Sequence, residues 1–169
     1  MIRILSVENM RKSDARTIAA GTPGRELMHR AGKGIFSAAR WAPPVAVICG
    51  SGNNAGDGYV LALLLRETGV DCDLIRLSDT FSEDGGYYYR QCQAAGVPDI
   101  PWETGISLEK YNTIADCLFG TGFRGTVRGA AREAVEAINA RGAAGARVIS
   151  VDINSGLNGN NGLADLTRA

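Results

Sequence analysis

The sequence has few of the features that mark nucleic-acid-binding, secreted or membrane proteins. Its 18 Lys and Arg residues are balanced by 18 Asp and Glu residues, and no basic run occurs, so the charge pattern gives no support for nucleic-acid binding. No apolar run reaches the length of a membrane-spanning helix, and the N-terminus lacks the apolar core of a signal peptide. We therefore expect a soluble, cytoplasmic protein.

Cysteine and histidine are also scarce. The four cysteines, at positions 49, 72, 92 and 117, have no paired spacing, and three of them lie in strand-like apolar runs. This distribution is typical of small core residues in a reduced protein and argues against a disulfide framework or a zinc site. The single histidine, His29, lies off the apolar stripe of a predicted helix, so we expect it to be solvated and not catalytic.

A glycine-rich stretch, residues 50–58 (GSGNNAGDG), lies between apolar runs at 45–49 and 59–65. This order predicts a strand, a loop and a helix, with the loop at the positive end of the helix, where anions bind. The stretch is not a Walker A loop, because no lysine precedes the helix. It matches the dinucleotide-binding pattern only in its short form, which is weak evidence alone. Asp57 is predicted to be the N-cap of the helix.

The remaining chain alternates between helical and strand-like patterns. Helices are predicted at about 8–20, 27–41, 83–95 and 130–141, and strands at about 70–77, 100–102, 113–119 and 147–152. A length of 169 residues fits one domain, 1–169. The alternation predicts the α/β class, with three layers in which helices cover both faces of a mainly parallel sheet.

Polar loops follow the carboxyl ends of three predicted strands, at residues 50–57, 119–126 and 152–158. Ligands bind at this edge of such sheets, so we expect the three loops to converge on one pocket. Asp116 lies in the middle of a strand that should be buried on both faces. Its carboxylate therefore needs hydrogen-bond donors, a cation or a raised pKa.

Two further features suggest contacts with other molecules. Tyr87, Tyr88 and Tyr89 are adjacent on a predicted helix and cannot all face one side, so at least one should be exposed, which would suit a homodimer interface. Asp79 follows the second strand at a distance compatible with a ribose-binding acid, although a turn residue is the simpler interpretation.

Four motifs together resemble the NAD(P)H-hydrate epimerases, the YjeF N-terminal domain family. Residues 52–58 (GNNAGDG) resemble the family's GNNGGDG loop, and residues 27–32 (LMHRAG) resemble its LM-x-x-AG helix. Residues 116–122 (DCLFGTG) resemble its D-x-x-x-GTG segment. Residues 152–156 (DINSG) resemble its D-I-P-S-G turn. They occur in the right order and span nearly the whole chain. Ala55 replaces a glycine, which is acceptable only where no positive φ is required, and Asn154 replaces a proline.

The resemblance implies a Rossmann-like fold and an isomerase of nicotinamide nucleotide repair. Such an enzyme converts the R form of hydrated NADH or NADPH to the S form, which a separate dehydratase then repairs. Its implied substrate contacts are Asn53, Asn54, Ala55, Gly56, Asp57, Gly120, Thr121, Gly122, Phe123, Arg124, Gly125, Thr126 and Asp152.

The resemblance also implies a potassium ion as cofactor, held by Asn54, Asp116 and Ser155. Amide, carboxylate and hydroxyl oxygens are ligands that suit a hard cation. Among the polar residues of the loops, we predict that Asp152 transfers the proton and that Asp57 acts mainly in positioning.

The resemblance is incomplete at the C-terminal end. The family's domain continues with further strands, whereas this sequence stops at Ala169, so we expect a C-terminally shortened domain without the dehydratase domain that is often fused in bacteria. Two other functions remain open. One is a non-catalytic nucleotide-binding or protein-interaction scaffold of the same fold, and the other is an NAD-dependent redox enzyme, for which only Asp79 gives a hint.

Overall fold

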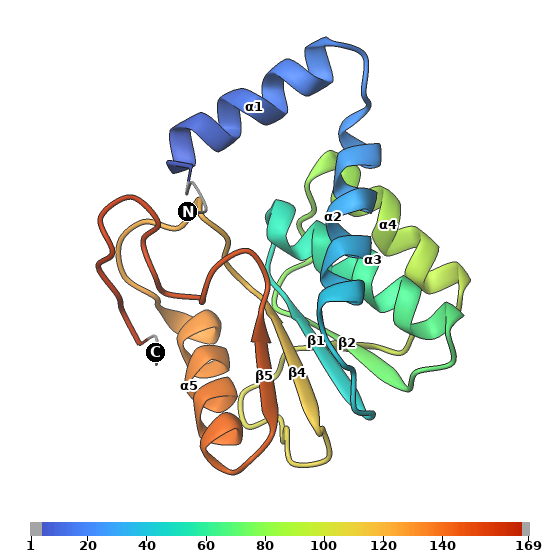
Figure 1. Cartoon of the computed structure of the whole chain (residues 1–169). Coiled ribbons are helices and arrows are strands. Elements are labelled where there is room, and N and C mark those ends of the chain that lie inside the picture. The colour runs from blue at the N-terminus through green and yellow to red at the C-terminus, as the bar shows by residue number, and fades with distance from the viewer. Residues whose placement is uncertain (1–4, 167–169) are drawn as a thin grey trace.

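The computed structural model describes residues 5–166, and the predicted alternation of helices and strands is confirmed there (Figure 1). The elements are, in chain order, α1 (Val7–Ala19), α2 (Gly24–Ala38), β1 (Val45–Cys49), α3 (Asn53–Glu67), β2 (Cys72–Arg76), α4 (Glu83–Ala94), β3 (Asp99–Pro101), β4 (Thr113–Cys117), α5 (Gly129–Ala143) and β5 (Arg147–Ser150).

In the described residues, the strands form one five-stranded sheet in the order β3-β2-β1-β4-β5, and every neighbouring pair is parallel. Helices α2, α3 and α4 cover one face and α5 covers the other (Figure 1). The fold is therefore the predicted three-layer, Rossmann-like α/β arrangement.

The central strand β1 supplies both cores because its side chains alternate between the two faces of the sheet. Val45, Val47 and Cys49 pack in the cluster that includes α3, and Ala46 and Ile48 pack in the cluster that includes α5. All five residues are fully buried. This explains why the strand is a continuous apolar run and does not alternate between apolar and polar residues.

Helix α3 begins at Asn53, before the apolar run that starts at Tyr59, and its N-cap is Gly52. The prediction that Asp57 caps this helix is therefore wrong, because Asp57 lies inside the helix. Gly52 offers no side-chain hydrogen bond to the first turn. The backbone N–H groups at this end of the helix are consequently open to a ligand.

The prediction that one of the three adjacent tyrosines is exposed is also wrong. Tyr88 is buried and its hydroxyl donates to the carbonyl of Arg25 at 2.9 Å. Tyr87 is half-buried beneath the Arg25 guanidinium, 4.8 Å from its ring centroid, and Tyr89 is half-buried with its hydroxyl bonded to Asp99. All three tyrosines are therefore at least partly covered by other residues of the chain.

The prediction for the histidine is only partly met, whereas the prediction for the cysteines is confirmed. His29 is half-buried and its ring stacks on that of Tyr88, with centroids 6.2 Å apart, so it is less solvated than predicted. The four cysteines are free and buried, as predicted. Within residues 5–166, no helix is both long and apolar enough to cross a membrane.

Candidate functional site

The three polar loops converge at the carboxyl end of the sheet, as predicted. They line a cavity of about 780 Å³ whose walls include residues 51–54 and Asp57 after β1, residues 118–123 after β4, and Val151 and Asp152 after β5. Parallel strands place the loops that follow them at one edge of the sheet, which explains this convergence.

Asp152 has a backbone φ of 65°, a left-handed conformation that is uncommon for a residue other than glycine. Its carboxylate accepts a hydrogen bond of 2.7 Å from the backbone N–H of Thr121. A Cβ on Gly120 would stand 2.5 Å from Asp152 Oδ2 and 3.3 Å from Asn54 Cβ. A side chain at position 120 would therefore force the Asp152 carboxylate to move, because Asp152 and Asn54 of α3 both close in on this glycine.

Asp57 contributes a second carboxyl group to this cavity. Burial, together with the smaller effects of the negative charges of Asp152 and Asp14, raises its pKa from 3.8 to about 7. A group that titrates near neutral pH can donate or accept a proton under ordinary conditions. The cavity thus contains a carboxyl group that is suited to acid or base chemistry.

Asp116 is buried in the middle of β4, and its carboxylate accepts hydrogen bonds from nearby donors, which is one of the alternatives predicted from the sequence. Its Oδ1 accepts from the Ser155 hydroxyl at 2.6 Å and from the Leu118 N–H at 3.2 Å, and its Oδ2 accepts from the Ser155 N–H at 3.1 Å. Burial raises the pKa of Asp116, and these hydrogen bonds oppose the rise. Asp116 and Ser155 border a separate cavity of about 500 Å³ beside α5 and β5.

Asn54 is 7% exposed, and neither atom of its side-chain amide has a hydrogen-bond partner among the described residues. A buried amide without a partner is unfavourable unless a ligand satisfies it. In residues 5–166, no three His, Cys, Asp or Glu side chains gather into a metal cluster. The donors present are amide, carboxylate and hydroxyl oxygens, which fit a hard cation better than a soft transition metal.

The other predicted site residues divide into two groups. Asn53, Gly120, Thr121, Gly122 and Phe123 border the 780 Å³ cavity, whereas Ala55, Gly56, Arg124, Gly125 and Thr126 do not. Ala55 and Gly56 are buried inside α3. Ala55 has no positive φ, so the condition for replacing the family's glycine is met.

Sequence reasoning missed the part of the cavity wall that comes from helices. Met10, Arg11 and Asp14 of α1 and Ala31 and Ile35 of α2 border the cavity. The α2 residues lie in or near the LMHRAG motif, which could have indicated them. Helix α1 is a polar segment that carries no motif, so nothing in the sequence identified it as part of a site.

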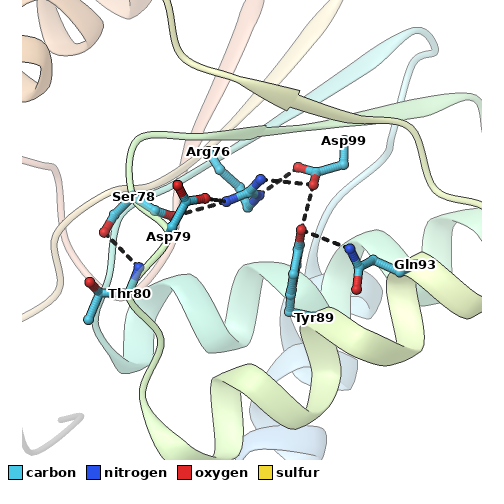
Figure 2. A network of polar contacts seen from close by, with 7 residues as sticks. All are labelled: Arg76, Ser78, Asp79, Thr80, Tyr89, Gln93 and Asp99. Atoms are coloured by element: carbon cyan, nitrogen blue, oxygen red, sulfur yellow. Dashed lines mark hydrogen bonds and ion pairs between the residues drawn. The ribbon is translucent and has the colours of Figure 1, made fainter.

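Asp79 lies outside the cavity and is bound to a buried arginine (Figure 2). Arg76 Nη1 contacts Asp79 Oδ1 at 2.6 Å, while Arg76 Nε and Nη2 donate to the two oxygens of Asp99 at 2.6 and 2.9 Å. The Tyr89 hydroxyl donates to Asp99 at 2.6 Å. Asp79 is thus a partner of Arg76, and the redox interpretation loses its proposed ribose-binding acid.

Comparisons of this sequence with known proteins agree with one another on its family. The family model described as YjeF-related protein N-terminus matches residues 24–169. The NAD(P)H-hydrate epimerase of Limosilactobacillus reuteri (strain DSM 20016) is 34% identical over 167 residues, which cover 95% of this chain and 77% of that protein. The bifunctional NAD(P)H-hydrate repair enzyme Nnr of Coxiella burnetii is also 34% identical, over 90% of this chain. This chain spans only 32% of that relative's length.

The fold is also found in a solved structure. The crystal structure of the yeast protein ynu0 (YNL200c) superposes with a TM-score of 0.79, covering 93% of this chain and 72% of that one. The sequences are 24% identical, so this likeness supports the Rossmann-like fold alone.

Proposed function

The chain belongs to the YjeF-related protein N-terminus family, and on that basis we propose that it is an epimerase of hydrated NADH or NADPH. The observation that carries the proposal is the meeting of Asp57 and Asp152 in one cavity at the carboxyl end of the sheet. Relatives about one third identical in sequence are named NAD(P)H-hydrate epimerases. The substrate, the site residues and the cation are all part of the proposal.

The reaction needs acid and base groups around one carbon atom. The hydrate carries a hydroxyl on the carbon beside the ring nitrogen. When this hydroxyl is protonated and leaves as water, the nitrogen lone pair stabilises the resulting cation. Water then adds to the other face of the ring and loses a proton, which gives the opposite epimer with no net change in composition.

The sequence suggested mainly a positioning role for Asp57, but its raised pKa leads us to assign one of these two proton transfers to it and the other to Asp152. Because its pKa is raised to about 7, Asp57 is partly protonated near neutral pH and can donate to the departing hydroxyl. Asp152 lies in the loop after β5 and accepts the proton of the incoming water. The bond from Thr121 N–H to Asp152 Oδ2 holds that carboxylate in place. Solvent exchange returns both groups to their starting states.

The potassium ion of the proposal would be held by Asn54, Asp116 and Ser155. The unpartnered amide of Asn54 and the buried carboxylate of Asp116 support this assignment, with Asn54 bordering the 780 Å³ cavity and Asp116 and Ser155 the 500 Å³ cavity. When bound, a cation would supply positive charge beside a carboxylate in the protein interior. The ion would then join the first turn of α3, which carries Asn54, to Ser155 in the loop after β5.

The test is the rate of interconversion of the epimers of hydrated NADH by wild type, D152N and D57N, followed by chromatography. D79N is the matched control, because Asp79 lies outside the cavity. We expect D152N and D57N each to lose about a hundredfold or more of the rate, as is typical for a proton-transfer group, and D79N to match wild type.

Undiminished activity of D152N, with ligand binding intact, would refute the role of Asp152. A folded wild-type protein that binds the hydrate without interconverting its epimers would refute the epimerase proposal. The scaffold interpretation would then be preferred.

A further inference from the structure

Helix α1 forms one wall of the cavity although it contributes almost nothing to the core. Of its thirteen residues, only Val7 is buried. The helix lies on the side of the sheet toward which the strands point, above the loops that follow β1 and β4 (Figure 1). Met10, Arg11 and Asp14 border the cavity from this helix. The position of α1 is therefore not explained by packing of the hydrophobic core.

Arg11 reaches from α1 to the second glycine-rich loop. Its Nη2 atom lies 3.4 Å from the point where a Cβ on Gly122 would stand. Among the described residues, its guanidinium has no ion-pair or hydrogen-bond partner, unlike Lys12 on the same helix, which pairs with Glu8 at 2.6 Å. An exposed arginine that lies beside a glycine loop without a partner has all its donors available for a ligand.

The charges around the cavity are unevenly distributed. In the described part of the chain, the carboxyl groups of Asp14, Asp57 and Asp152 border it, and Arg11 is its only lysine or arginine. Arg11 also borders a second hollow of about 450 Å³, where it is joined by Lys12 and Arg124 and by one carboxylate, that of Glu8, which pairs with Lys12. Arg124 is fixed there, because its Nη1 donates to the carbonyl of Thr121 at 3.0 Å.

A hydrated dinucleotide carries a reacting ring at one end and a doubly charged diphosphate farther along. The diphosphate would be repelled by the carboxyl groups and attracted to the arginines. We propose that Arg11 of helix α1 binds the diphosphate of the substrate together with Arg124, so that α1 orients the ring toward Asp57 and Asp152. This inference rests on the proposed function, because it assigns the orientation of that same substrate.

Calorimetric binding of ADP-ribose tests the inference, since this probe carries the diphosphate but lacks the reacting ring. The variant is R11Q and the matched control is R16Q, which removes the same charge from the same helix at a position that does not border the cavity. We expect R11Q to weaken binding about tenfold and R16Q to stay within about twofold of wild type. Salt should weaken binding to wild type more than to R11Q.

A kinetic measurement separates binding from chemistry. With hydrated NADH as substrate, R11Q should raise KM about tenfold and leave kcat within about twofold of wild type, because Arg11 is not assigned to proton transfer. Thermal unfolding of R11Q should match wild type, since the guanidinium has no partner among the described residues.

Equal affinity of wild type and R11Q for ADP-ribose, or equal losses in R11Q and R16Q, would overturn the inference. Failure of wild-type protein to bind ADP-ribose would overturn it as well. Loss of ADP-ribose binding in R11Q together with no epimerisation by wild type would uphold the role of Arg11 and refute the epimerase proposal. The two failures are therefore distinguishable.

Discussion

The hydroxyl of Ser155 donates a hydrogen bond of 2.6 Å to the carboxylate of Asp116, which lies 39 residues earlier in the chain. The same hydroxyl accepts a hydrogen bond of 3.0 Å from the backbone N–H of Phe119. One buried side chain thus joins the loop after β5 both to β4 and to the loop that follows β4. Two of the three loops that form the cavity are held together at this point.

The variant S155A tests this connection. It leaves the Phe119 N–H without its acceptor and removes one donor from a buried carboxylate, so the free energy of unfolding should fall by about 1–3 kcal/mol. S51A is the matched control, because Ser51 is exposed in the loop after β1, and it should have the stability of wild type. Denaturant unfolding measures both, and equal stability of S155A and wild type would contradict the account.

The variant N54A tests whether Asn54 binds the proposed potassium ion. Ligand that binds only the folded state raises its stability, so potassium chloride should raise the melting temperature of wild type relative to choline chloride at equal ionic strength. N54A should lose this potassium-dependent shift, whereas N53A should keep it, because Asn53 is exposed. A full potassium-dependent shift in N54A would remove Asn54 from the cation site.

The sequence predicted the sheet well because the central strand β1 is a continuous apolar run and because helical patterns and turn residues separate the strands. Asp116 is the best example of a site residue that could be predicted, because a carboxylate inside a buried strand demands donors. The errors have local causes. Asp57 was assigned as an N-cap because apolar periodicity begins only at Tyr59, whereas the helix begins at Asn53.

Two other features depend on tertiary contacts that no local pattern encodes. Tyr87 and Tyr89 are covered by the side chains of Arg25 and Arg76, which come from distant segments. The contribution of α1 to the cavity depends on where the connection to α2 places the helix. Arg11 in a polar helix therefore gave no signal in the sequence.

Asp57 predicts a specific pH dependence of stability. Its pKa rises from 3.8 to about 7 on folding, so the folded state binds more protons than the unfolded state between these values, and stability falls as pH rises through this range. D57N lacks this titration. The stability of D57N relative to wild type should therefore increase from about pH 4 to about pH 7, by about 4 kcal/mol, and then level off.

Denaturant titrations of wild type and D57N at a series of pH values measure this difference. D79N provides the control, since its side chain is 95% exposed, and its stability relative to wild type should stay nearly flat. A constant difference between D57N and wild type across the range would show that the pKa of Asp57 is not raised.

Substitutions of Arg76 and Asp79 should have unequal effects on the free energy of unfolding. R76L leaves Asp99 without its bidentate partner at a position where the carboxylate is only 22% exposed, so unfolding should become easier by about 3 kcal/mol. D79N removes only an exposed partner and should change stability by less than about 0.5 kcal/mol. Equal effects in calorimetric unfolding would mean that the network in Figure 2 does not stabilise the fold.

The central claim is tested most directly by starting separately from the pure R and the pure S form of hydrated NADH and following both by chromatography in potassium buffer. We predict that the two samples approach the same mixture at rates proportional to protein concentration. The contradicting result is a folded protein that binds ADP-ribose but does not accelerate the interconversion of either epimer above its uncatalysed rate. This cavity would then not be an epimerase site.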